Sequence, residues 1–125
     1  MKLFTVQEAN ELLPSVRKIL QRIQRSRRRL AAYSGEAKLA AEGADLGGGG
    51  MSAGSDYAAI LTNSTLELAE LEELGVQLKD FDRGLIDFPS LRDGRVVLLC
   101  WQLGEGDELE WWHDLESGFA GRTRL

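Results

Sequence analysis

The sequence predicts an α+β domain in which an antiparallel helical hairpin packs on a small, mainly antiparallel C-terminal β-sheet. Three observations lead to this fold class: apolar residues recur at helical spacing in two segments before Gly75, a glycine-rich segment separates them, and extended apolar runs with turn signals follow. The chain has 125 residues, 43% of them hydrophobic and 28% charged, which suits one modest core. We therefore expect a single domain over residues 1–125.

The first part, residues 1–42, is expected to be a basic helical arm. Thr5 and Glu8 have the spacing of a capping box, which predicts a helix start at Val6. Pro14 lacks the N–H that a helix interior needs, so we expect a short helix to end before it and a longer one to begin there. The longer helix carries a stripe at the steps of a short coiled coil, interrupted by one arginine: Val16, Leu20, Ile23, Arg27 and Leu30.

A connector and a second helix are expected next. Residues 43–54 are half glycine and lack an apolar period, which indicates a flexible connector; no Gly-Lys-Ser/Thr ending supports a phosphate-binding loop. An acidic helix is expected over 55–75, capped by Ser55 or Asp56 and stopped by a left-handed Gly75. Because one helix is basic and the other acidic, the two should pack antiparallel as a hairpin.

After the second helix the period becomes extended, which predicts a β-rich part over 76–125. Strands are expected at 76–78 and 85–88, with an interruption at Asp82-Arg83-Gly84 between them, and turns at Pro89-Ser90 and Asp93-Gly94 before the next strand. Residues 95–103 are apolar on both faces, as in a central strand that helices cover on one side and a second subunit or another element covers on the other.

A hairpin should follow, with a four-residue loop at 104–107, a strand at 108–114 and a loop at 118–122. A symmetric loop predicts three cross-strand pairs: Leu103 with Glu108, Cys100 with Trp111, and Leu98 with His113. Cys100, Trp111 and His113 would then lie on one side of the sheet.

Charge is distributed unevenly, although the net charge is only −5. Residues 1–40 hold nine Lys and Arg against three acidic residues, and 41–125 hold six against seventeen, giving +6 and −11. The overall acidity argues against a dedicated nucleic-acid binder, because affinity for phosphates needs a basic surface. Binding of nucleic acid through the basic face from Arg17 to Arg29 is kept as an alternative.

Cysteine content and hydropathy indicate the compartment. Cys100 is the only cysteine, so it cannot form an internal disulfide, which fits a reducing compartment, and a zinc finger is excluded. The first residues lack the apolar segment of a secretory signal, and no apolar run approaches the roughly 18 residues that cross a bilayer. We expect a cytoplasmic protein with no membrane contact.

Several segments carry a family resemblance. They are Phe4 to Pro14, Val76 to Asp80, Gly84 to Pro89, Arg92 to Gly94, Leu99 to Glu105, and Trp112 to Arg122. Together they resemble a bacterial family catalogued as "domain of unknown function 2203". The resemblance implies no activity, because the family supplies no catalytic residues to carry over.

Candidate metal ligands are Cys100 and His113, joined by Glu116 or by an aspartate from residues 80–87; these side chains suit a divalent transition metal. The alternative is packing, because free cysteines are usually buried and lone histidines often bond a carbonyl. Cys100 and His113 as nucleophile and base are disfavoured, since apolar neighbours in mid-strand favour the protonated thiol. An enzyme is therefore not expected, and no cofactor apart from such a metal.

A second group of charged residues follows the first strand. Asp80, Asp82 and Asp87 surround Arg83, which predicts either an ion-pair network or a site for a hard cation. The network is favoured because Arg83 and Arg92 supply the countercharge.

Aromatic residues suggest a binding surface. Trp111 and Trp112 are adjacent in an expected strand, so they point to opposite faces and cannot share one core. The tryptophan that the core does not cover predicts an interaction surface, which would comprise these residues: Trp101, Trp111, Trp112, Phe119 and Arg122. The alternative is a C-terminal loop folded over the sheet through Phe119. We expect a non-enzymatic protein-interaction or regulatory module, forming a homodimer through the helix stripes or the second sheet face.

Overall fold

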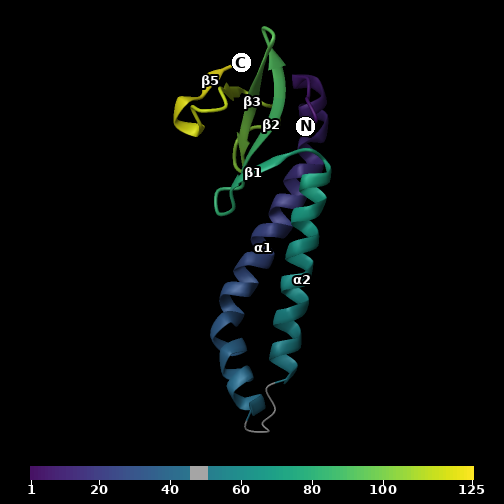
Figure 1. The fold of residues 1–125 in the computed structure, drawn as a ribbon, viewed down its shortest axis with the longest axis vertical. Coiled ribbons are helices and arrows are strands. Elements are labelled where there is room, and N and C mark those ends of the chain that lie inside the picture. Colours follow the sequence, from purple (N-terminus) through teal and green to yellow (C-terminus); the bar gives the residue numbers. More distant parts are fainter. Residues whose placement is uncertain (46–50) are drawn as a thin grey trace. The chain divides into compact units, whose positions relative to one another are not determined.

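The computed structural model describes residues 1–45 and 51–125, and for 34–45 and 51–54 the backbone alone. Its elements follow in this order: α1 (Val6–Asp45), α2 (Met51–Glu73), β1 (Gln77–Asp80), β2 (Leu85–Arg92), β3 (Arg95–Gln102), β4 (Trp111–His113), the 3₁₀ turn η1 (Phe119–Gly121) and β5 (Thr123–Arg124). The strands form one antiparallel sheet in the order β1-β2-β3-β4-β5 (Figure 1). The predicted α+β class is confirmed.

The chain divides into two compact units, Met1–Gln21 with Glu70–Leu125, and Arg22–Ala69. The first unit holds the whole sheet and the first turns of α1. In the second unit α1 and α2 pack as a hairpin, where the Ser26 hydroxyl donates to the Glu67 carboxylate at 3.0 and 3.3 Å. Among the described residues, no helix has the length and apolarity that crossing a membrane requires.

The predicted capping box starts α1. The Thr5 N–H donates to Glu8 Oε1 at 2.9 Å, and the Glu8 N–H donates to Thr5 Oγ1 at 3.0 Å. The expected break at Pro14 is wrong, because α1 continues through it. Leu13 and Val16 are fully buried on either side of Pro14. Burying each contributes about 1.5–3 kcal/mol, which offsets the roughly 3 kcal/mol cost of an interior proline.

The helices extend further than expected at the hairpin tip. α1 ends at Asp45 and α2 begins at Met51, so the predicted connector 43–54 and the cap at Ser55 or Asp56 are wrong in their bounds. Each added helical residue forms one more backbone hydrogen bond, which offsets a glycine penalty of about 1 kcal/mol near a helix end. The remaining connector residues, 46–50, lie outside the described residues.

The end of α2 agrees with the prediction. Gly75 has a φ of 89°, its N–H donates to the Glu72 carbonyl, and the Val76 N–H donates to the Leu71 carbonyl. This is a Schellman stop, which glycine accommodates because it has no Cβ. The chain then enters the sheet at Gln77.

Of the two turns expected near the β2–β3 hairpin, one is confirmed and the other is wrong. Asp93 and Gly94 both have positive φ, 51° and 79°, in the two-residue turn. Pro89 and Ser90, expected to turn, lie inside β2. Pro89 is tolerated there because β1 pairs with β2 only up to Asp87, so no strand on that side requires an N–H from Pro89. Its carbonyl instead accepts a hydrogen bond from the Phe4 N–H at 2.7 Å.

The β3–β4 register is the predicted one at two pairs, Cys100 with Trp111 and Leu98 with His113. β4 is shorter than expected and no ladder forms between Leu103 and Glu108, because the Leu109 N–H instead donates to Asn10 Oδ1 on α1 at 2.7 Å. The tail expected as a loop forms η1, and β5 was not predicted.

The sheet has two covered faces within the first unit. One face packs against the N-terminal segment and α1, where Phe4 meets Phe88 edge to face at 5.3 Å and Arg17 lies over Trp101. The opposite face carries the side chains that alternate with these along β2 and β3. The C-terminal segment, yellow in Figure 1, lies on that side of the sheet. The candidate site lies beneath it.

Candidate metal centre

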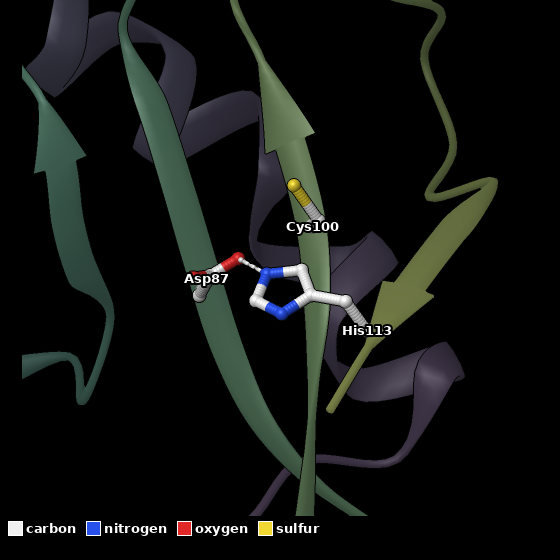
Figure 2. Close-up of side chains that lie close together, drawn as sticks. All are labelled: Asp87, Cys100 and His113. Atoms are coloured by element: carbon white, nitrogen blue, oxygen red, sulfur yellow. Dashed lines mark hydrogen bonds and ion pairs between the residues drawn. The ribbon is translucent and has the colours of Figure 1, made fainter. Parts of the chain in front are cut away.

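Three adjacent strands bring Asp87, Cys100 and His113 together on the face that α1 does not cover (Figure 2). Asp87 on β2 is paired with Cys100 on β3, and His113 on β4 is paired with Leu98, two residues before Cys100. One ligand atom of each side chain lies within 4.8 Å of the others. All three residues are buried, at 2%, 1% and 4% exposure. Among the described residues this is the group with metal-ligand spacing.

The hydrogen bonds of His113 determine its tautomer. Nδ1 lies 2.7 Å from the Asp114 carbonyl oxygen, and Nε2 lies 3.0 Å from Asp87 Oδ1. Because a carbonyl oxygen can only accept, Nδ1 carries the proton. Nε2 and the Asp87 carboxyl therefore share one proton, or Nε2 offers its lone pair to a cation that replaces that proton.

Burial controls the protonation of the other two groups. It raises the pKa of the Asp87 carboxyl, while the charges of His113 and Lys79 act in the opposite direction. Burial, helped by the charge of Asp87, raises the pKa of the Cys100 thiol to about 12, against the effect of Arg122. Without an added cation the thiol is protonated at neutral pH, which argues against a cysteine nucleophile.

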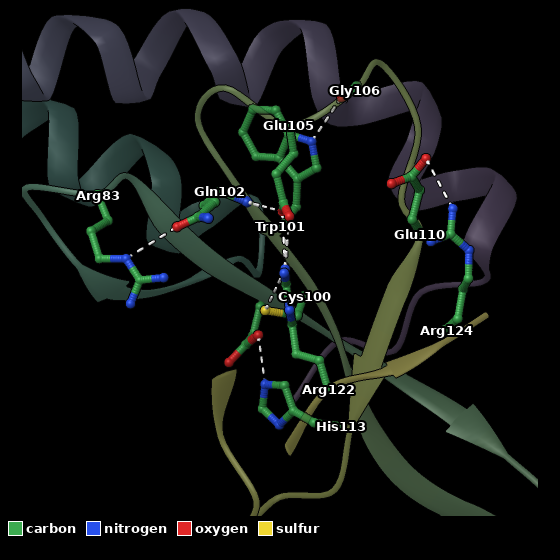
Figure 3. A network of polar contacts seen from close by, with 11 residues as sticks. Arg83, Cys100, Trp101, Gln102, Glu105, Gly106, Glu110, His113, Arg122 and Arg124 are labelled. Carbon is green, nitrogen blue, oxygen red and sulfur yellow. Dashed lines mark hydrogen bonds and ion pairs between the residues drawn. The ribbon is translucent and has the colours of Figure 1, made fainter. Parts of the chain in front are cut away.

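Arg122 closes the Cys100 side of the site (Figure 3). Its Nη1 donates to both Glu105 carboxylate oxygens, at 2.9 and 3.1 Å, and lies 3.9 Å from Cys100 Sγ. The guanidinium stacks on Phe119 at 4.0 Å and on Trp111 at 4.7 Å. Arg122 is thus a half-buried cation whose anion, Glu105, is supplied by the same chain.

A cavity of about 160 Å³ borders the site. Asp87 and His113 form part of its wall. The remaining lining is mostly apolar, with one cation: Leu85, Leu98, Leu115, Gly118, Phe119 and Lys79. Cys100 is not among the lining residues, so the cavity borders the carboxylate and imidazole ligands.

The structure brings some of the predicted metal ligands together and leaves one outside the group. Cys100 and His113 come together as expected, and Asp87 is the aspartate that joins them. Glu116 is exposed and lies outside the group, in the turn where the Ser117 N–H donates to the Asp114 carbonyl. The sequence signal for Asp87 is a single carboxylate within the apolar run of β2.

Of the residues in the expected ion-pair cluster, Asp80 contacts Arg83 and Asp87 lies elsewhere. Asp80 accepts the Arg83 backbone N–H at 3.1 Å, which caps the turn. The Arg83 side chain donates to Gln102 Oε1 and lies over the Phe119 ring. Asp87 belongs to the buried site instead, where it pairs with His113. No sequence pattern indicated that Lys79, Glu105 and Arg122 would lie around that site.

The predicted aromatic surface is corrected in part. Trp101 is 1% exposed and donates to the Gly106 carbonyl, so it belongs to the core. Trp111 and Trp112 occupy opposite faces, as expected from strand geometry. Trp111 lies beneath Arg122 and Arg124 of the same chain and is half-buried.

Comparison with known proteins gives one match. The model of a family described as "Uncharacterized conserved protein (DUF2203)" matches residues 2–125, in agreement with the resemblance found in the sequence. No curated protein and no solved structure matches the chain.

Proposed function

This chain belongs to the DUF2203 family, and we propose that it binds one divalent transition-metal ion of the zinc class through Asp87, Cys100 and His113. The observation that carries the proposal is the convergence of a carboxylate, a thiol and an imidazole, with ligand atoms within 4.8 Å of one another. Zinc accepts all three ligand types, and three protein ligands leave one position of a tetrahedral site for a further ligand.

Charge balance supports the proposal. A dication would neutralise the Asp87 carboxylate and the Cys100 thiolate, so the buried group as a whole would be neutral. Without a metal, the Asp87 carboxyl lies on an apolar face of the sheet beside Leu85 and Leu98, and burial raises its pKa. Removing a charge from water is costly unless it is paired, and metal coordination is one way to pair it.

The groups around the ligands also support the proposal. The Asp114 carbonyl holds His113 with its proton on Nδ1, which leaves Nε2 as the ligand atom. Histidine ligands in proteins usually donate their other ring N–H in this way. Arg122 lies 3.9 Å from Cys100 Sγ and would favour the thiolate that a metal requires.

Metal loading tests the proposal directly. Protein prepared without a histidine tag, stripped with chelator and exposed to Zn²⁺ should retain about one ion per chain by elemental analysis. With Co²⁺ the protein should show a thiolate-to-cobalt charge-transfer band that Cys100→Ser removes. His113→Ala should lose stoichiometric metal, whereas the matched control Glu116→Gln should keep it, since Glu116 is exposed.

Two results would refute the proposal. One is the lack of a stoichiometric ion in protein that circular dichroism shows to be folded. The other is a cobalt spectrum that Cys100→Ser leaves unchanged, because it would place the ion elsewhere.

The expected role as a non-enzymatic regulatory module is compatible with this centre, in which a metal-bound state differs in stability from the metal-free one.

A further inference from the structure

The cavity beside the ligands has the dimensions of a small-molecule site. Its volume is about 160 Å³. An engineered protein cavity of about 150 Å³ binds benzene, so a molecule of about six non-hydrogen atoms fits in such a space. Leu85, Leu98, Leu115 and Phe119 line it with hydrocarbon. An occupant must therefore be largely apolar.

Polar groups of the cavity lie where an acid group could be bound. Asp87 and His113 form part of the wall, and Lys79 adds an ammonium group. With Asp87 bound to a dication, the positive charge of Lys79 would be left for another anion. Cys100 does not line the cavity and lies next to the Arg122–Glu105 pair. A metal ion held by Asp87 and His113 would border the cavity, because both of these residues line it.

We propose that this cavity binds a small monocarboxylate, with its carboxylate between the metal ion and Lys79 and its hydrocarbon chain against Leu85, Leu98 and Phe119. This inference rests on the metal centre proposed above. Carboxylate oxygen is a good ligand for zinc, and a charge-assisted bond to Lys79 would add to binding. The apolar wall disfavours inorganic phosphate or sulfate, which would lose hydration without finding enough hydrogen-bond donors.

Butyrate is the probe, because it has about six non-hydrogen atoms and fits the cavity volume. Its addition to the Co²⁺-loaded protein should shift the visible d–d bands in a saturable manner. Butyramide, the neutral molecule of the same shape, should produce no comparable shift. Acetate should bind more weakly than butyrate by roughly tenfold, because it buries two fewer methylene groups.

Lys79 variants separate the carboxylate site from the metal site. Lys79 is exposed, so its replacement should leave the fold intact. Lys79→Met should keep the thiolate-to-cobalt band and weaken butyrate binding by roughly tenfold, as expected for the loss of a charge-assisted hydrogen bond. Lys79→Arg, the matched control, keeps the charge and should bind butyrate more tightly than Lys79→Met does.

The outcomes are distinguishable. If the thiolate-to-cobalt band is present but butyrate does not shift the d–d bands, or butyramide shifts them equally, the carboxylate site is refuted and the metal centre stands. Equal butyrate affinity in wild type and Lys79→Met also refutes it. If the thiolate-to-cobalt band itself is missing, both proposals fail.

Discussion

Asp87 is an unusual residue at its position. Among the residues whose side chains are described, it is the only acidic one that is buried, and its carboxylate lies 3.0 Å from His113 Nε2. A buried polar pair is often no more stabilising than apolar residues of the same size. A contribution to stability is therefore a weak explanation for the presence of Asp87 and His113 at these buried positions. Binding of a ligand is a stronger explanation.

Substitution of Asp87 and His113 in chelator-treated protein tests whether the buried carboxyl depends on its histidine partner. His113→Phe should lower the free energy of unfolding by about 3 kcal/mol or more, because it leaves the Asp87 carboxyl buried without its partner. Adding Asp87→Leu to His113→Phe should restore most of that loss. Urea unfolding followed by tryptophan fluorescence gives both values. A double variant as unstable as His113→Phe would show that the carboxyl is not the source of the loss.

At the residue scale, part of the site could be predicted from sequence. Cys100 and His113 were placed on one face because the length of the hairpin loop determines the register of β3 and β4. The sequence is compatible with Asp87 both as a metal ligand and as a member of the cluster around Arg83, four residues before it. Arg83 lies in the turn before β2 and contacts Gln102 and Phe119, whereas the pairing of Asp87 with Cys100 places Asp87 in the buried site.

At the scale of elements, two prolines account for the main errors. Pro14 is exposed within α1, and Pro89 lies in β2 where Phe4 supplies the backbone contact. In both cases tertiary packing supports a backbone that local rules disfavour, and such packing cannot be read from the proline itself. The capping box, Gly75 and the Asp93-Gly94 turn were predicted correctly because their geometry depends on adjacent residues alone.

The start of α1 should depend on pH. The hydrogen bonds from Thr5 lower the pKa of the Glu8 carboxyl below its usual 4.5. A lowered folded-state pKa means that the stabilisation is present above the unfolded pKa and is lost as pH falls through the folded one. The wild type should therefore lose more thermal stability on acidification below pH 4.5 than Glu8→Gln does. Scanning calorimetry of both proteins across this range measures the difference, and equal losses would contradict the prediction.

At the scale of the whole molecule, the ligands of the proposed metal belong to a single unit. Asp87, Cys100 and His113 all lie in the unit of Met1–Gln21 with Glu70–Leu125, and Arg22–Ala69 contributes none of them. An ion that binds only the folded unit stabilises it by mass action, by about 2.7 kcal/mol at a free concentration 100 times the dissociation constant. The stabilisation need not extend to a unit that opens independently.

Hydrogen exchange can locate the effect of the metal along the chain. At that Zn²⁺ concentration, the slowest amides of β2, β3 and β4 should exchange roughly 100-fold more slowly than in chelator-treated protein, because exchange through unfolding is suppressed by the binding factor. Amides of Arg22–Ala69 should change much less, since they can exchange by opening of their own unit. Chelator should reverse the change, and His113→Ala should not show it. An equal slowing in both units would mean that the chain unfolds as one cooperative body, whereas slowing confined to Arg22–Ala69 would place the ion away from the sheet.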